Sequence, residues 1–297
     1  MELARRVGVY GVLRDAGRVL VVREGREPEV WSLPGGLVAH AEHPERAVVR
    51  AVSGQTGSTV AVGRLLAVVA DVTVLAQEDI SLHTDRLLFE VAARGGASGS
   101  AGGGEVETLW VTPEEAARLP LTPFSAELLG LPVTPLPAGT HRSAEPIPPP
   151  HPDRRLRFGA YGLVTDPAGR ILLTQIADGY PGAGKWHLPG GGTDHGEQPT
   201  TGLLRELVEE GGQLGRVVEL LGVDNLHNPA ALGPEGRPLD WHGVRVIYRV
   251  LVDVPTDAVV TESAGGSTAR AGWFTRAQAA DLPLTGIAAS AIGQRGR

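Results

Sequence analysis

Apolar and polar positions follow the same order in the two halves of this chain. Near the start of each half, an apolar run is interrupted by an Asp/Gly turn, as "VGVYGVLRDAGRVLVV" at 7–22 and as "FGAYGLVTDPAGRILLT" at 158–174. Such a pattern predicts two short strands joined by a turn. Further apolar runs at 65–74 and 245–254 predict more strands. The chain is therefore expected to contain the same arrangement of elements twice.

Each half also closes in the same way. A tryptophan, a short predicted helix and a shared "LPLT" end both "LWVTPEEAARLPLT", from Leu109, and "GWFTRAQAADLPLT", from Gly272. Between the halves the sequence becomes rich in proline, which is typical of a semi-rigid connector. A duplication this long predicts two similar layered α/β domains. We expect domains at 1–131 and 156–297, with a linker at 132–155.

Composition narrows the possible functions. The 297 residues, 42% of them hydrophobic, suffice for two domain cores. The chain has no cysteine, so a metal would be held by oxygen or imidazole ligands. The absence of a long apolar run and of a leader pattern favours a cytoplasmic protein without a membrane partner. A net charge of −7 argues against nucleic acid as a partner.

One stretch of the second half concentrates acidic residues behind a glycine-rich turn. It reads "LPGGGTDHGEQPTTGLLRELVEEGG", from 188 to 212. On a helix, with Glu206 taken as zero, Glu210 lies roughly 40° to one side and Glu209 roughly 60° to the other. These acids are expected to share one face, with the opposite, buried face formed by Leu204, Leu207 and Val208.

Like charges at this spacing destabilise an isolated helix, and a divalent cation reverses that effect. Carboxylates without sulfur ligands suit magnesium or manganese, which share their coordination with substrate phosphates. The glycine turn allows the backbone to approach a metal or phosphate, and Gly211 is expected to pack against the sheet. The alternative is a solvated helix face, which most runs of charge are.

The spacing from Gly191 through Glu197 to the run "RELVEEGG" at 205–212 resembles the Nudix box, the signature of hydrolases that cleave diphosphates linked to another moiety. The departure is Gln213, where the family usually has an aliphatic residue, and it concerns packing. In outline the resemblance covers 158–292 and, without the acids, 7–131. It implies two Nudix-type α/β/α sandwich domains with mixed sheets.

The resemblance also implies roles for individual residues. Glu206, Glu209 and Glu210 would hold the metal and help to activate water, and the Gly190 carbonyl would be a further ligand. Glu197 and Arg205 would form a structural pair that locks the loop onto the helix. The implied cofactor is magnesium or manganese. The general base is either Glu206 or a loop acid outside the box, for which Glu262 is our candidate.

The first half keeps the frame of this motif without its acids. "WSLPGGLVAHAEHPERAVVRAVSGQTG", at 31–57, retains Glu42 and Arg50, but the three acidic positions hold Ala51, Gly54 and Gln55. We expect this domain to be folded and inactive, as a structural pseudo-partner. The alternative is that it still binds a ligand. The whole chain is then a monomer acting as a pseudo-dimer, or a homodimer.

Other residues are weaker candidates. For His40 and His195, at equivalent box positions, a loop-packing role is favoured over metal ligation. The connection 223–246 exceeds ordinary loop length, which indicates a functional or mobile segment. Its aromatic and charged side chains suit the nonphosphate part of a substrate. The candidate substrate-binding residues are His187, Asp194, His227, Trp241 and Arg245.

The resemblance implies a magnesium-dependent Nudix hydrolase, and the acids place its chemistry in the second domain. By the same resemblance, the default substrate is a nucleoside diphosphate derivative, such as a nucleoside triphosphate, a nucleotide sugar or ADP-ribose. A prenyl or other non-nucleotide diphosphate is the first alternative. The second is a non-catalytic sensor of a nucleotide metabolite, and an interaction scaffold would fit the first half alone.

Overall fold

A computed structural model describes residues 1–24, 30–94, 106–134, 151–232, 237–261 and 266–293. By their contacts these residues form two compact units. Unit 1 comprises Met1–Leu156 together with His227–His242, and unit 2 comprises Arg157–Leu226 together with Gly243–Arg297. Most of the predicted linker, at 135–150, lies outside the described residues. We refer to 1–131 and 156–297 as the first and second repeats.

The first repeat folds into a six-stranded sheet in unit 1, with the strand order β4-β5-β1-β2-β6 and β3 paired to β1. β1 and β5 run parallel, while β1 pairs with β2 and β3, β2 with β6, and β4 with β5 in antiparallel fashion, so the sheet is mixed. The strands are β1 Glu2–Asp15, β2 Arg18–Glu24, β3 Gly35–Leu37, β4 Val60–Leu75, β5 Ile80–Ala93 and β6 Val106–Val111. The helices are α1 Pro44–Thr56, α2 Pro113–Ala116 and α3 Pro123–Leu128.

The second repeat follows the same order. Its sheet runs β11-β12-β7-β8-β13, with β10 on β7 and β9 on β8. The strands are β7 Arg154–Thr165, β8 Ile171–Ile176, β9 Trp186–His187, β10 Gly190–Gly192, β11 Arg216–Leu232, β12 Pro238–Leu251 and β13 Thr268–Phe274. The helices are α4 Pro199–Gly211, α5 Arg276–Ala280 and α6 Gly286–Gly293. The predicted duplication of strands, box helix and closing helices is therefore confirmed.

One prediction about this repeat is wrong. The connection 223–246 is not a long loop, because its described residues lie largely in β11 and β12. Its asparagine, proline and glycine residues are typical of loops, since such residues are depleted in strands. Backbone pairing in the sheet overrides that local preference, and a tertiary interaction of this kind leaves little trace in composition.

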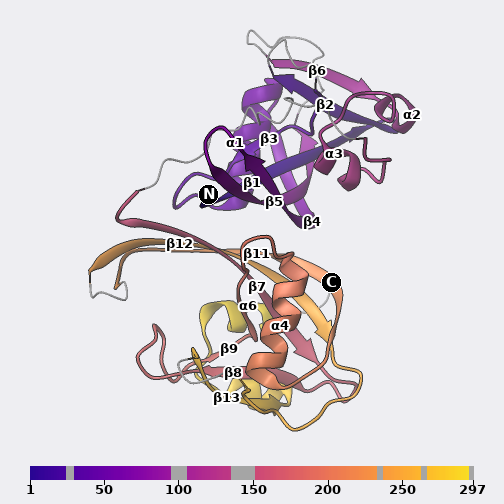
Figure 1. Ribbon diagram of the computed structural model, residues 1–297. Helices are drawn as coiled ribbons and strands as arrows, with labels where there is room; N and C mark the ends of the chain where they lie inside the picture. Colours follow the sequence, from indigo (N-terminus) through magenta and orange to yellow (C-terminus); the bar gives the residue numbers. More distant parts are fainter. Residues whose placement is uncertain (25–29, 95–105, 135–150, 233–236, 262–265, 294–297) are drawn as a thin grey trace. The chain divides into compact units, whose positions relative to one another are not determined.

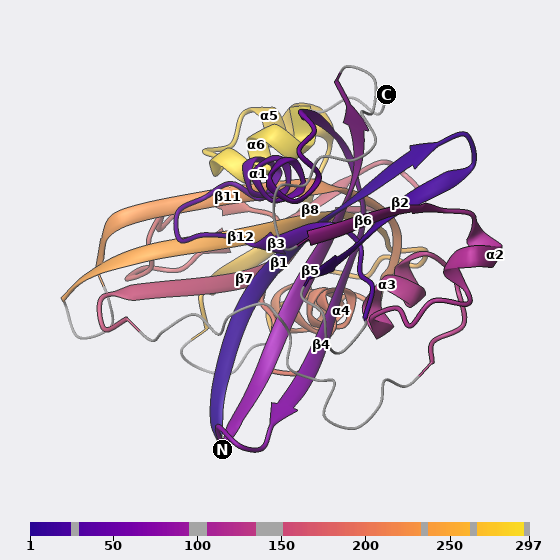
Figure 2. The same ribbon diagram turned by 90° about the horizontal axis from the view of Figure 1, so that it is seen from above.

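Helices cover both faces of each sheet, as Figures 1 and 2 show for α1 and α3 beside β1 and β5. Successive residues of β1 point to opposite faces. A Cβ on Gly11 would lie 2.9 Å from the Val52 side chain of α1, while Tyr10 packs in a core cluster with Ala126 of α3. In unit 2 the corresponding cluster joins the sheet to α5 and α6, and α4 contacts β8, β10 and β13.

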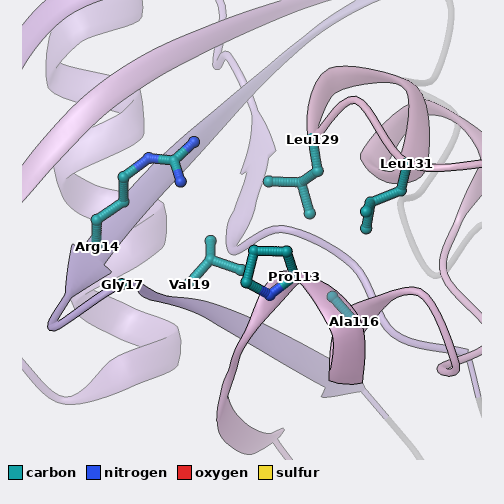
Figure 3. A pocket seen from close by; sticks show the side chains of 7 residues that line it. All are labelled: Arg14, Gly17, Val19, Pro113, Ala116, Leu129 and Leu131. Atoms are coloured by element: carbon teal, nitrogen blue, oxygen red, sulfur yellow. The ribbon is translucent and has the colours of Figure 1, made fainter.

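Among the described residues, no helix has the length and apolar character needed to span a bilayer. A hollow in unit 1, bordered by Val19, Pro113, Leu129 and Leu131 (Figure 3), offers only about 30 Å³. That is room for a water or two, far below the size of a small-molecule site.

Candidate active site

The acidic helix α4 begins and ends on residues suited to those positions. Proline lies in its first turn, where a missing N–H costs nothing, and Gly212 ends it in the left-handed conformation with φ 65°. In the first repeat, α1 likewise has proline in its first turn and ends on left-handed Gly57, with φ 67°. The two boxes therefore hold helices of the same length, 13 residues each, at the same point of the fold.

The glycine turn before α4 has no room for side chains. Gly190 has φ 130°, and a Cβ there would lie 2.2 Å from the Ala160 carbonyl oxygen. A Cβ on Gly191 would lie 2.7 Å from Oε1 of Glu206. The absence of side chains brings this backbone against β7 and the acidic helix, so the turn is fixed beside the carboxylates.

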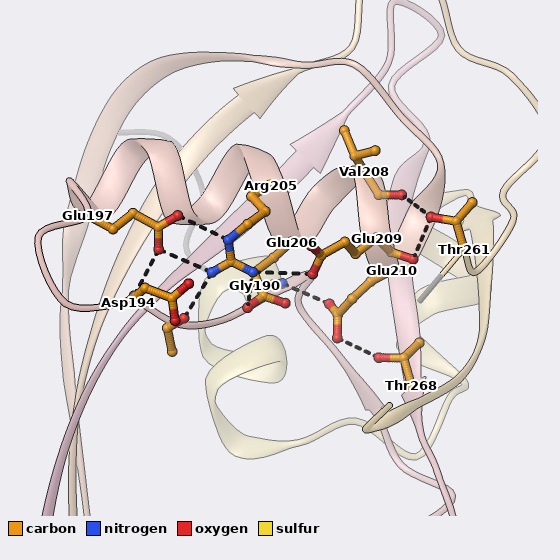
Figure 4. A network of polar contacts seen from close by, with 11 residues as sticks. Gly190, Asp194, Glu197, Arg205, Glu206, Val208, Glu209, Glu210, Thr261 and Thr268 are labelled. Carbon is orange, nitrogen blue, oxygen red and sulfur yellow. Dashed lines mark hydrogen bonds and ion pairs between the residues drawn. The ribbon is translucent and has the colours of Figure 1, made fainter. Parts of the chain in front are cut away.

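Glu197 and Arg205 join the loop to the helix (Figure 4). Arg205 donates from Nε to Oε1 of Glu197 at 3.0 Å and from Nη2 to Oε2 at 3.1 Å, a bidentate pair. Nη2 also donates to the Gly192 carbonyl at 3.3 Å. The carboxylate of Glu197 additionally accepts from the backbone N–H of Asp194. Loop, turn and helix are thus held at one guanidinium.

The same guanidinium contacts two of the remaining acids. Its Nη1 lies 3.1 Å from Oε1 of Glu206 and 3.2 Å from Oε2 of Glu209. Hydrogen bonding to Glu197, with a further contribution from Glu206, raises the pKa of Arg205, which therefore stays charged. In the network of Figure 4, three carboxylates bond this one guanidinium, and a fourth, that of Glu210, bonds Gly190 and Thr268 instead. The network carries an excess of negative charge.

Glu210 differs from the other two helix acids because it is only 4% exposed. Its Oε2 accepts from the backbone N–H of Gly190 at 2.9 Å, and its Oε1 accepts from the Thr268 hydroxyl on β13. Both oxygens of this buried carboxylate are therefore bonded to groups that fix its orientation. Glu210 connects the glycine turn, the helix and the sheet.

The predicted division of the helix faces needs correction. Val208 is 39% exposed, whereas Leu203, Leu207 and Glu210 are buried. The buried face is centred between Glu210 and Leu207, so Glu206 and Glu210 point toward the glycine turn and Val208 points away. The sector of the helix that is buried is set by how the helix packs on the sheet, which helical periodicity alone does not determine. Gly211 does pack as expected, since a Cβ there would lie 2.9 Å from Leu172.

The first repeat reproduces this frame without the charges. Arg50 donates to both oxygens of Glu42, at 2.8 and 2.7 Å, and to the Leu37 carbonyl at 2.8 Å. Gln55 accepts from the backbone N–H of Gly35 at 2.8 Å. That bond matches the one between Gly190 and Glu210, so the amide preserves the geometry of the turn but contributes no negative charge.

A polar cluster lies on the other side of the glycine turn in unit 2. Tyr161 and His187 make an edge contact with ring centroids 5.0 Å apart, and Nδ1 of His187 lies 2.7 Å from the Thr285 hydroxyl. Arg245 donates from Nε to Asp224 at 2.7 Å. Burial, with a smaller contribution from Arg245, lowers the pKa of His187 to about 4, so its ring is neutral at pH 7.

Unit 1 has the tyrosine, arginine and aspartate of this cluster, with serine in place of the histidine and an aromatic ring beside the arginine. Arg86 pairs with Asp71 at 2.6 Å and donates to the Tyr10 hydroxyl. The ring of Phe124 lies 4.1 Å from the Arg86 guanidinium carbon and 4.5 Å from the Tyr10 ring. By its place in the repeat, Phe124 corresponds to Ile287 of the second repeat. The cationic group of unit 1 is therefore covered by protein.

Comparison with known proteins decides the family. The model of the NUDIX domain matches this chain twice, at residues 2–130 and 154–292. The chain belongs to the NUDIX family. Both repeats are thus NUDIX domains, as the sequence predicts.

Curated relatives match short stretches of this NUDIX protein. An RNA pyrophosphohydrolase of Acidiphilium cryptum is 50% identical over 56 residues, covering 18% of this chain and 33% of the relative. An 8-oxo-dGTP diphosphatase of Haemophilus influenzae is 38% identical over 68 residues, or 23% of this chain and 50% of the relative. The chain therefore spans at most half the length of these two relatives. A MutT NUDIX hydrolase structure from Burkholderia pseudomallei is 30% identical, with a TM-score of 0.37, over 48% of this chain and 99% of that one.

The structure treats the predicted site residues of the NUDIX domains in four ways. Unit 2 brings Gly190, Glu197, Arg205 and the helix acids together, with His187 and Arg245 in the cluster around Tyr161. The side chains of Asp194 and His195 are exposed. His227 and Trp241 belong to unit 1, where His227 contacts Asp240. Glu262 lies outside the described residues.

The sequence reasoning missed several groups that contact this site. Thr268 bonds Glu210, Tyr161 contacts His187, and Gln213 bonds the segment 256–257. Tyr161 could have been found, because "YG" occurs at the same place in both repeats. Thr268 gives no such signal, since its importance arises only where β13 passes the end of α4.

Proposed function

We propose that this NUDIX protein hydrolyses the diphosphate bond of a nucleoside diphosphate derivative, with a divalent cation bound in the second repeat. The observation that carries the proposal is the excess of negative charge in Figure 4, where Glu197, Glu206 and Glu209 bond Arg205 and the buried Glu210 adds a further carboxylate. Oxygen ligands of this kind fit magnesium or manganese. The first repeat, with one Glu42–Arg50 pair at its box, has no such excess among its described residues.

Within this proposal the helix acids have different tasks. Arg205 makes one hydrogen bond to Glu206 and one to Glu209, so a cation could replace it at either carboxylate by displacing a single bond to the guanidinium. Glu210 holds its place through Gly190 and Thr268. Bound magnesium would neutralise the diphosphate and lower the pKa of a water ligand. The base that removes the proton is Glu206 or Glu262.

The cluster around Tyr161 suits the nonphosphate part of the substrate. A neutral His187 offers a hydrogen bond without charge, and Arg245 offers a cation held in place by Asp224. Stacking and hydrogen bonding of this kind fit a nucleoside better than a prenyl chain. The names of the relatives, an RNA pyrophosphohydrolase and an 8-oxo-dGTP diphosphatase, favour the same class.

We also propose that the chemistry is confined to the second repeat and that the first is a structural partner. Ala51 and Gly54 offer no side-chain ligands, Gln55 is already bonded to Gly35, and Phe124 covers Arg86. The first repeat thus lacks the charge that would hold a cation, and the ring of Phe124 covers its Arg86 guanidinium.

The test is product release in the presence of magnesium from nucleoside triphosphates, nucleotide sugars, ADP-ribose, dinucleotides and prenyl diphosphates. Glu209→Gln and Glu210→Gln should each reduce turnover at least 100-fold. Gly54→Gln, which places the same side chain at the corresponding position of the first repeat, should leave turnover unchanged. If no substrate in the panel releases product and calorimetry shows that a nucleotide binds, the protein is a sensor and the hydrolase proposal is wrong.

A further inference from the structure

Unit 1 contains a cluster of histidines around one carboxylate, outside the box acids. His40 lies between β3 and α1, while His227 and Asp240 lie on the parts of β11 and β12 that belong to unit 1. Nε2 of His40 is 3.1 Å from Oδ2 of Asp240, and Nε2 of His227 is 2.8 Å from Oδ1 of the same carboxylate. One carboxylate therefore holds two imidazole nitrogens, one at each oxygen.

The ligand atoms of these three residues all lie within 4.8 Å of one another. Ligands at about 2.0–2.1 Å from a tetrahedral zinc ion are about 3.3–3.4 Å apart. Asp240 would supply one of its two oxygens, so the three ligand atoms need to approach one another by at most about 1.5 Å. Small rotations of the side chains suffice for such a change.

The chemistry of the donors is also selective. Two imidazoles and one carboxylate suit zinc and related transition metals, whereas magnesium prefers oxygen donors alone. The His40 side chain is 19% exposed, Asp240 27% and His227 35%. They are sheltered enough to be held by their neighbours and open enough for an ion and a water ligand to enter.

Two neighbours complete the surroundings. The His242 ring is buried and makes an edge contact with His40, with centroids 5.4 Å apart, which restricts the orientation of the His40 ring. Arg154 lies 3.6 Å from Oδ2 of Asp240, and its side chain is 51% exposed. This guanidinium competes with a metal for the carboxylate, and its exposure lets it move into solvent when an ion binds.

We propose that His40, His227 and Asp240 form a zinc-binding site in unit 1, distinct from the magnesium site of the box acids. Three protein ligands and a water complete a four-coordinate ion. The metal would link His227 and Asp240 to His40 in the box loop of the first repeat. Bound zinc would therefore raise the free energy of unfolding of unit 1, by an amount that grows with the zinc concentration relative to its Kd. His40 then differs in role from its counterpart His195, whose side chain is exposed.

The experiment uses the full chain, freed of metal by a chelator and kept in excess magnesium to fill the box acids. Calorimetric titration with zinc should show one tight site per chain, and cobalt should give the visible absorption bands of a tetrahedral ion. His40→Ala, His227→Ala and Asp240→Asn should each weaken zinc binding at least about 100-fold, since loss of an outer partner alone costs 10–100-fold. His195→Ala, the matched change in the second box, should retain it.

Three outcomes would overturn the proposal. The first is the absence of a tight zinc site in the unaltered protein, a result that needs no variant to fold. The second is zinc binding that survives in all three variants. The third is zinc binding that is lost in Glu209→Gln and kept in Asp240→Asn, which would place the ion at the box acids instead.

Discussion

Gln213 provides a test of how the last turn of α4, which carries Glu209 and Glu210, is held in place. Its side chain is 1% exposed, and its Nε2 donates to the Gly211 carbonyl at 2.9 Å and to Oγ1 of Thr256 at 3.0 Å. Its Oε1 accepts from the backbone N–H of Thr256 at 3.0 Å. The segment that begins at Thr256 then satisfies carbonyls at the end of α4, because Val259 N–H donates to Gly211 and Thr261 N–H donates to Glu209.

We expect Gln213→Leu to lower the free energy of unfolding by about 2 kcal/mol. Three good hydrogen bonds at about 1 kcal/mol each are lost, and water replaces them only on the exposed side of Thr256. The better burial of leucine offsets about 1 kcal/mol. Because the last turn of α4 carries Glu209 and Glu210, we also expect the half-saturating magnesium concentration for hydrolysis to rise several-fold.

Urea denaturation measures the stability change, and hydrogen exchange of the Val259 and Thr261 amides reports whether the segment has detached. Gln175→Leu is the matched control, because Gln175 bonds the Gly184 carbonyl and Arg270 in an exposed setting. This change should alter stability by less than about 0.5 kcal/mol. The reasoning is refuted if Gln213→Leu is as stable as the unaltered protein and its amides exchange at the same rate.

Three further predictions concern other parts of the two repeats. Thr268→Val removes the hydroxyl that donates to Glu210, which should raise the half-saturating magnesium concentration while circular dichroism stays unchanged; unaltered magnesium dependence would contradict this. Gly54 lies inside α1 with nothing near an added Cβ, so Gly54→Ala should stabilise unit 1 by about 0.5–1 kcal/mol in urea, and a loss would show that the helix needs glycine there. The pKa of His187 is lowered to about 4, so its contribution to stability is complete above the unfolded value near 6.5 and is lost as the pH falls toward 4. His187→Asn should therefore lose about 2 kcal/mol less stability than the unaltered protein between pH 7 and pH 4.5, and parallel pH profiles would contradict the assignment.

Local sequence patterns were sufficient to predict much of the fold. The turn at Gly17, the left-handed end of α4 at Gly212 and the pairing of Glu197 with Arg205 all depend on residues close in sequence. Such features follow from the conformational preferences of glycine and from helical periodicity. Their repetition at Gly57 and at Glu42 with Arg50 made the duplication visible without any structure.

Long-range packing could not be predicted from the sequence in the same way. The strand character of 223–246 was missed because its turn-forming residues outweigh its apolar ones, and only sheet pairing decides the matter. The exposure of Val208 and the burial of Glu210 depend on the angle at which α4 meets the sheet. A helical wheel gives the relative positions of side chains on a helix, but not which sector faces the core.

The sequence by itself determined that two NUDIX domains are present and that one carries the acids, because the box is a local pattern of glycine, charge and helical spacing. The tertiary structure decided which groups meet. It brought Thr268 to Glu210, Gln213 to Thr256, and His227 and Asp240 to His40. Those contacts join residues that are far apart in the chain, and their geometry is fixed only when strands pair and helices pack.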